Sequence, residues 1–251
     1  MNWSRFILFL VIGFFAQLID GTLGMAYGVS CRTFLKTIAG LPAALASAAV
    51  HCAEMFTTLV SGISHLSLKN VSMDLLWRLA LPGVVGGILG AWFLTRVGDV
   101  LEPFIDVYLI VMGFIILRKA FQPQRERPRK IGSYVFPLGF VGGFLDATGG
   151  GGWGPVVTST MLARGHDVRK TIGTVNTAEF MVTVAQTTTF FALLSDFTSH
   201  WQVILALIIG GMAAAPFAAW LCKRCPVKPL LGIVGCVIIV LNLYNFVTRF
   251  T

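Results

Sequence analysis

The sequence has few charges and lacks any polar stretch long enough to fold by itself. Only 12% of its 251 residues are charged, whereas 56% are hydrophobic and the mean hydropathy is +0.80. A typical soluble domain carries about 25% charged residues. Three uncharged runs, at 79–95, 203–222 and 230–248, approach the ~20 residues that cross a hydrocarbon core. The sequence therefore predicts an all-α integral membrane protein.

Motifs for metal, nucleotide and covalent chemistry are also missing. Cys222 and Cys225 form a CxxC pair, but no second pair or nearby histidine completes a zinc site. The stretch 149–154 contains G-x-G-x-x-G through glycine density alone, and the chain has no G-K-[ST] motif. No serine or cysteine nucleophile has a matched base. We expect no enzyme activity, no metal, no cofactor and no nucleic-acid partner, and we assign the net charge of +8 to loops beside a membrane.

A glycine-rich segment is present twice. QLIDGTLGMAYG at 17–28 aligns with GFLDATGGGGWG at 143–154, and HCAEMFTT at 51–58 aligns with NTAEFMVT at 176–183. Both alignments place acidic residues opposite acidic residues in apolar surroundings. Internal repeats of this kind are typical of transporters. The duplication predicts a first repeat at 1–120, a basic cytoplasmic linker at 121–132 and a second repeat at 133–251.

The positive charges favour one membrane topology. If all eight apolar segments crossed the membrane, the Lys and Arg residues would divide 10 to 9, which the positive-inside rule disfavours. If the first segment of each half enters and returns on the same side, 14 of the 19 lie on one side and 5 on the other. Non-helical backbone at membrane depth is tolerated where protein buries it or water reaches it. We therefore expect two inverted repeats, each a broken re-entrant hairpin plus three transmembrane helices.

Ionisable side chains inside the apolar segments are the first candidates for a site. Such a group costs at least ~2.5–3.5 kcal/mol on insertion scales, so it usually marks a pathway. His51 and Glu54 lie three residues apart on one helix face, as do their counterparts Asn176 and Glu179. An aspartate before a glycine-rich turn also often caps a helix. The predicted coupling or site-shaping residues are Asp20, His51, Glu54, Asp146 and Glu179.

The remaining candidates lie at the glycines and beyond Glu179. No arginine or lysine is expected in the middle of a segment, so backbone N–H groups at half-helix N-termini would hold an anion. Glycines allow close approach of the backbone, threonines add hydroxyl donors, and bulky aromatics form a wall. A proton on Glu54, Glu179 or His51, or a sodium ion, would then provide coupling. The predicted substrate-binding residues are Thr22, Gly24, Tyr27, Gly28, Thr148, Gly150, Gly151, Trp153, Asn176 and Gln186.

Two copies of this motif, each opening half of the chain, and N-T-A-E at 176–179 together resemble the TauE/SafE (TSUP) family of sulfite exporters. The resemblance implies a secondary transporter in the cell inner (plasma) membrane that exports sulfite, thiosulfate or an organosulfonate such as sulfoacetate. It implies coupling to a proton or cation gradient. The first copy departs from the family pattern with Leu23, Met25 and Ala26 where glycine is commoner. A passive anion channel and a transporter of another small organic anion are the alternatives, and the lipid bilayer and a homo-oligomer are the expected partners.

Overall fold

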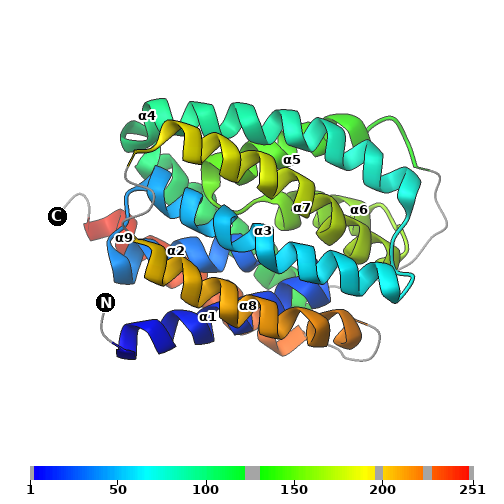
Figure 1. Ribbon diagram of the computed structural model, residues 1–251, viewed down its shortest axis with the longest axis horizontal. Helices are drawn as coiled ribbons and strands as arrows, with labels where there is room; N and C mark the ends of the chain where they lie inside the picture. The colour runs from blue at the N-terminus through cyan, green and yellow to red at the C-terminus, as the bar shows by residue number, and fades with distance from the viewer. Residues whose placement is uncertain (1–2, 122–130, 196–199, 223–227, 249–251) are drawn as a thin grey trace.

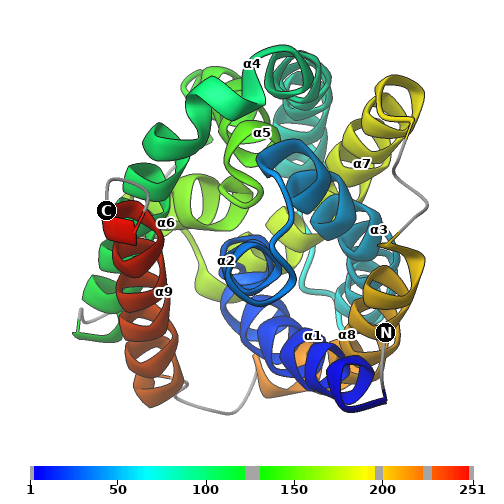
Figure 2. The ribbon, with the colours of Figure 1, turned by 90° about the vertical axis from the view of Figure 1, so that its left-hand side faces the viewer.

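The computed structural model describes residues 3–121, 131–195, 200–222 and 228–248, and these residues form helices and no strand. The all-α prediction is confirmed. In chain order these helices are α1 (Trp3–Leu23), α2 (Tyr27–Ala39), α3 (Ala43–Ser67), α4 (Met73–Phe121), α5 (Val135–Gly149), η1 (Gly154–Thr158), α6 (Ser159–Ala163), α7 (Val168–Leu193), α8 (Trp201–Leu221) and α9 (Lys228–Thr248). Most helices run lengthwise through the molecule, and several of them, α9 among them, are inclined to its longest axis (Figure 1 and Figure 2).

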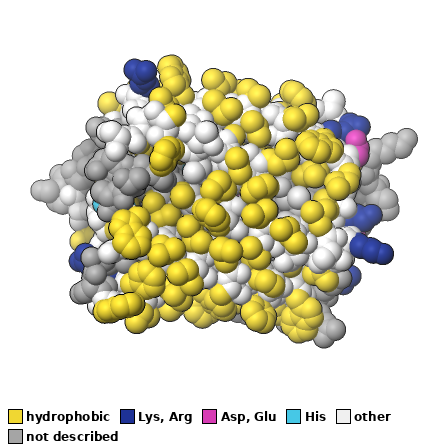
Figure 3. Space-filling view, viewed as in Figure 1, with side chains coloured by type: hydrophobic (Ala, Val, Ile, Leu, Met, Phe, Trp, Pro, Cys, Tyr) yellow, Lys and Arg dark blue, Asp and Glu magenta, His cyan; other side chains and the backbone are white. Residues whose placement is uncertain are grey.

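Five segments of the described chain are long and apolar enough to cross a membrane. They are α1, α3, α8 and the two parts of α4, Met73–Gly98 and Val100–Arg118, which meet where Val97 leaves the helical conformation. The space-filling view shows hydrophobic side chains across the middle of the face and Lys and Arg at its two ends (Figure 3). This band fits the hydrocarbon core, and the chain is a multi-pass membrane protein. α7, expected to span, is not among the five because polar residues interrupt it, and of α9, also expected to span, only the shorter apolar stretch Gly235–Thr248 was found. α1, expected to be half of a re-entrant hairpin, is among the five, so the re-entrant arrangement stays a prediction.

The two glycine-rich segments are the points where helices break. α1 ends at Leu23 and α2 begins at Tyr27, while α5 ends at Gly149 and η1 begins at Gly154. Gly24 and Gly150 have φ angles of +68° and +66°, in the left-handed region that L side chains avoid. Ala26 also has a positive φ, of 101°. Strain of this kind at a non-glycine residue is typical of functional sites.

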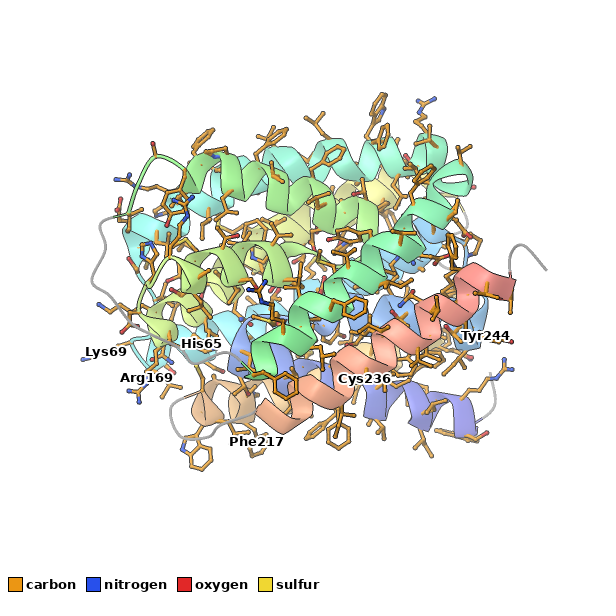
Figure 4. The ribbon with its side chains drawn as sticks, turned by 180° about the vertical axis from the view of Figure 1, so that it is seen from behind. His65, Lys69, Arg169, Phe217, Cys236 and Tyr244 are labelled. Atoms are coloured by element: carbon orange, nitrogen blue, oxygen red, sulfur yellow. The ribbon has the colours of Figure 1, made fainter. Side chains whose placement is uncertain are left out.

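The two broken pairs open toward opposite ends of the molecule. Arg5 of α1, Ala39 of α2 and His200 line one pocket, so the α1–α2 pair begins and ends at one end. At the start of α5, the Tyr134 hydroxyl lies 2.6 Å from Nε2 of His166, which follows α6. Figure 2 looks onto the first end, with α2 enclosed by α1, α3 and α9. Figure 4 shows Lys69 and Arg169 together at one end and Tyr244 at the other.

The two breaks lie against each other, and their contacts are reciprocal. A Cβ on Gly28 would lie 2.6 Å from Cα of Gly151, and a Cβ on Gly154 would lie 2.5 Å from Cα of Met25. The hydroxyls of Thr58 and Thr183, 125 residues apart, are separated by 3.5 Å. A two-fold relation between the halves would produce such contacts. The division into repeats at 1–120 and 133–251 stays a prediction, and most of the predicted linker at 121–132 lies outside the described residues.

Glycines also bring the long helices into backbone contact. A Cβ on Gly86 of α4 would lie 2.0 Å from the Phe140 carbonyl oxygen of α5. A Cβ on Gly210 of α8 would lie 2.0 Å from the Leu10 carbonyl oxygen of α1. Small residues at such positions let membrane helices approach closely. The broken helices α1 and α5 are therefore fixed against α8 and against the continuous part Met73–Gly98 of α4, which holds the two breaks in place.

Candidate functional site

Asp146 organises the break after α5. Its Oδ1 accepts hydrogen bonds from the Gly152 amide at 2.8 Å and the Trp153 amide at 3.0 Å. Its Oδ2 accepts one from Nε2 of Gln186 at 3.0 Å, and the same nitrogen donates to the Gly143 carbonyl at 3.2 Å. Asp146 therefore ties the end of α5 to the backbone that leads into η1. It also uses two of the N–H groups that were expected to bind an anion.

His51 and Glu54 form a buried pair beside Asp146. Nε2 of His51 lies 3.2 Å from the Asp146 carbonyl oxygen, and Nδ1 lies 2.9 Å from Oε2 of Glu54. A carbonyl oxygen can only accept, so Nε2 must carry a hydrogen. The contact with Glu54 then needs one further proton. If this proton is on Nδ1, the pair is an imidazolium and a carboxylate; if it is on Oε2, the pair is a neutral imidazole and a carboxylic acid. The pair thus holds one transferable proton and is electrically neutral when it does so.

The same cluster has the geometry of a cation site. One ligand atom each from His51, Glu54 and Asp146 lies within 4.8 Å of the other two. Nδ1 of His51 is 3.8 Å from Oδ2 of Asp146. Nitrogen and carboxylate ligands suit a transition metal. The direct bond between His51 and Glu54 means that these groups already satisfy each other through a proton.

Asn176 makes at the first break the contact that His51 makes at the second. Its Nδ2 lies 3.5 Å from the Asp20 carbonyl oxygen, and its Oδ1 accepts from the Ser61 hydroxyl at 2.9 Å. Glu179, one turn later on α7, is 3% exposed. We call the two groups the Asp146 half-site (His51, Glu54, Asp146, Gln186) and the Asp20 half-site (Gln17, Asp20, Ser61, Asn176, Glu179).

The two half-sites lie close enough to interact. The hydroxyls of Thr58 and Thr183, which follow Glu54 and Glu179 by one turn, lie 3.5 Å apart, so the helices that carry the two glutamates meet beside the breaks. All four predicted carboxyl groups are buried, with exposed fractions of 3% or less. A Cβ on Gly28 would lie 3.0 Å from Oε1 of Glu54, which places this carboxyl between the break and His51. The structure thus brings the five predicted coupling residues together.

The hydroxyl and aromatic candidates use their polar atoms within the protein. Thr22 donates to the carbonyls of Leu18 and Ala218, and Thr148 donates to those of Phe144 and Leu145. The Tyr27 hydroxyl donates to the Leu207 carbonyl at 3.4 Å, and Nε1 of Trp153 donates to the Val175 carbonyl at 3.1 Å. The donor role expected of these four side chains is not available in this conformation. They fix the helices around the breaks.

The expectation that no arginine lies in the middle of a segment is wrong. Arg32 of α2 is completely buried. A Cβ on Gly150 would lie 2.0 Å from its Cδ and 2.7 Å from its Nε, so its stem packs against the second break. One turn later, Lys36 forms ion pairs with Asp106 and, at 3.8 Å, with Glu102. One sequence feature could have indicated that Arg32 faces the breaks. Arg32 lies four residues after Gly28 of the first glycine-rich segment, and this spacing places the two residues on one helix face.

Broken helices that meet inside an apolar bundle, with buried ionisable groups around the breaks, define a membrane transport protein. The family model for the sulfite exporter TauE/SafE matches residues 9–245, and the chain belongs to this family. The chain is similar to the probable membrane transporter protein YtnM of Bacillus subtilis (strain 168). The two are 42% identical over 246 residues, which cover 95% of this chain and 82% of that protein. The family and this relative identify a membrane transporter.

Proposed function

We propose that the protein is a secondary transporter that exports small sulfur-containing anions, such as sulfite, thiosulfate or sulfoacetate, across the plasma membrane. The observation that carries the proposal is the cluster of four buried carboxyl groups with His51 and Arg32 at two facing breaks. The family description names sulfite export. The proposed substrate-binding residues are the candidates that the sequence indicates around the two breaks, together with Arg32.

The charges of the cluster explain why transport would be coupled. With all four carboxyls ionised, the cluster holds four negative charges against at most two positive ones, on Arg32 and His51. A unit charge about 8 Å away costs an anion about 2 kcal/mol at an effective dielectric constant near 20. An anion therefore binds only after carboxyls have taken up protons or another cation. Anion binding and cation binding become one linked process.

The proton in the His51–Glu54 pair is the natural coupling proton. When it leaves, a bare Nδ1 lone pair faces a carboxylate oxygen across 2.9 Å, and the pair changes from neutral to negative. The negative pair would reject an anion from the neighbouring break. The anion and the proton would therefore move together, and the direction of net transport would follow their combined gradients.

Transport in proteoliposomes tests the proposal. Labelled sulfite, thiosulfate and sulfoacetate are measured with and without an imposed pH gradient. We expect at least one of them to be transported and its accumulation to respond to the gradient. Glu54→Gln should lose that response, because it removes the carboxyl that shares the proton of His51. The matched control is Asp74→Asn, which neutralises an exposed carboxylate bonded only to Arg78 at the surface and should behave as the wild type.

Each outcome has a definite meaning. No transport of any of the three sulfur anions would overturn the substrate class. Transport that follows the anion gradient and ignores pH, with Glu54→Gln unchanged, would replace coupled transport by a passive anion pore. A loss of the pH response in both Glu54→Gln and Asp74→Asn would show that the effect does not come from the buried pair.

A further inference from the structure

Gln17 is a buried polar residue of the Asp20 half-site with no role in the proposed function. It lies on α1, three residues before Asp20 and so on the same helix face. Its side chain is completely buried. A Cβ on Gly21 would lie 3.3 Å from Nε2 of Gln17 and 3.5 Å from the Ser61 hydroxyl. The amide thus lies beside Gly21, next to the first break.

The two halves supply this amide from opposite helices. In the alignment of the halves, Gln17 corresponds to Gly143 and Ser61 to Gln186. In the second half the α7 amide of Gln186 reaches across to Gly143 of α5. In the first half the α1 amide of Gln17 and the Ser61 hydroxyl of α3 both lie beside Gly21. Each half-site therefore contains one glutamine in addition to its aspartate. The glutamine comes from α7 in the Asp146 half-site and from α1 in the Asp20 half-site.

The amide nitrogen is paired in one half-site and unpaired in the other, while the amide oxygens of both Gln186 and Gln17 lack a hydrogen-bond partner within the described part of the chain. Nε2 of Gln186 donates to Oδ2 of Asp146 at 3.0 Å. Among the described residues, Oδ2 of Asp20 and both Oε1 and Nε2 of Gln17 have no hydrogen-bond partner. Buried polar atoms are nearly always partnered in proteins. The Asp20 half-site thus has the residues of a closed network but lacks the bond that closes it, as expected of a site that receives a ligand.

The chemistry of the unpaired atoms favours a cation. Asp20 lies in the last turn of α1, where the helix dipole is negative and attracts positive charge. Glu179 adds a second carboxyl that interacts electrostatically with Asp20. Asn176 stands where the other half-site has His51, so the group offers oxygen ligands and no imidazole. Carboxylate and amide oxygens are the ligands of hard cations.

We propose that the Asp20 half-site binds a cation of its own, separate from the proton that His51 and Glu54 share, between Oδ2 of Asp20 and Oε1 of Gln17. The cation is a proton or a sodium ion, and either would join the two unpaired oxygens. This inference rests on the proposed transport function but concerns cation binding alone. It can therefore be measured without a sulfur anion, so its failure is separate from a failure of the proposed substrate.

The experiment uses the full-length protein in lipid nanodiscs. Equilibrium binding of ²²Na⁺ is measured at constant ionic strength in choline chloride, and proton uptake after a pH jump is measured with an indicator dye in sodium-free buffer. The test variant is Gln17→Met, which keeps the length of the side chain, and Asp20→Asn is a second variant. Gln202→Met, at a half-buried position in the pocket with Arg5, is the matched control. Melting and size-exclusion profiles confirm that each variant is folded.

Loss of an oxygen that supports a bound ion is expected to weaken its binding about 10- to 100-fold. Saturable ²²Na⁺ binding that weakens in Gln17→Met and Asp20→Asn, but not in Gln202→Met, identifies sodium. If the wild type binds no ²²Na⁺, a proton uptake that falls by one in Asp20→Asn and moves to lower pH in Gln17→Met identifies the proton. Sodium binding and proton uptake that are the same in Gln17→Met as in the wild type would overturn the proposal, as would equal effects in Gln202→Met.

Discussion

Gly150→Ala tests the packing of the second break against Arg32. Gly150 has a φ of +66°, and a Cβ there would lie 2.0 Å from Cδ of Arg32. Gly40, at the end of α2, has nearly the same φ of +67°, but a Cβ there would meet nothing within 4 Å. The left-handed conformation costs an L residue about 1–2 kcal/mol at either position. Overpacking adds about 1–3 kcal/mol at Gly150 alone, because buried Arg32 cannot swing into solvent.

We therefore expect Gly150→Ala to lower the free energy of unfolding by about 2–5 kcal/mol and Gly40→Ala by about 1–2 kcal/mol. The assay is unfolding in mixed micelles of increasing denaturing detergent. Arg32→Ala removes the clashing atoms, so on that background Gly150→Ala should cost no more than Gly40→Ala does. If the two glycine variants differed by less than about 0.5 kcal/mol, within the usual error of additivity, Arg32 would not lie against this break.

Two further predictions concern a hydroxyl and a helix contact. Tyr27→Phe removes the hydroxyl that donates the long bond to the Leu207 carbonyl and that also contacts the Cys31 thiol. It should cost about 1 kcal/mol and leave the KM for the transported anion unchanged; a large rise in KM would show that the hydroxyl reaches the substrate. Gly86→Ala should lower the free energy of unfolding by about 1–3 kcal/mol through its clash with the α5 backbone. The control is Gly232→Ala, because a Cβ at Gly232 would meet open space. It should be neutral or stabilise the protein by up to about 1 kcal/mol, since alanine is the better helix former. Equal effects of Gly86→Ala and Gly232→Ala would refute the close contact between α4 and α5.

Much of the architecture could be predicted because it depends on local sequence. The charge deficit and apolar runs indicate membrane helices, and glycine density indicates where helices break. The i,i+3 spacing of His51 and Glu54 correctly predicts a pair, because the pitch of a helix sets which side chains are neighbours. The aligned acidic residues indicate that the two breaks belong together. These inferences need no knowledge of which helices pack side by side.

The residues that were missed depend on tertiary contacts. Arg32 follows the apolar part of its segment and reads as an interfacial charge, but α2 turns back into the bundle and buries it against Gly150. Gln17 aligns with Gly143 in the other half, so a comparison of the two halves does not mark it as a site residue. Its relation to Gln186 appears only when α1 is seen beside α3 and α5 beside α7. Likewise, the bonds of Thr22 and Tyr27 to α8 carbonyls could not be read from the segment that contains them.

The difference between the two half-sites bears on how an inverted arrangement could work. Two identical half-sites of opposite orientation would present the same groups to both faces of the membrane. Here the backbone contacts are reciprocal, but the side chains are not, since His51 corresponds to Asn176 and the glutamine comes from a different helix in each half. The Asp146 carboxylate is fully hydrogen-bonded beside a shared proton, whereas Asp20, among the residues that the structure describes, keeps an unpaired carboxylate oxygen. A substrate between the breaks would therefore meet a different cation chemistry on each side, which allows loading and release to differ between the two faces.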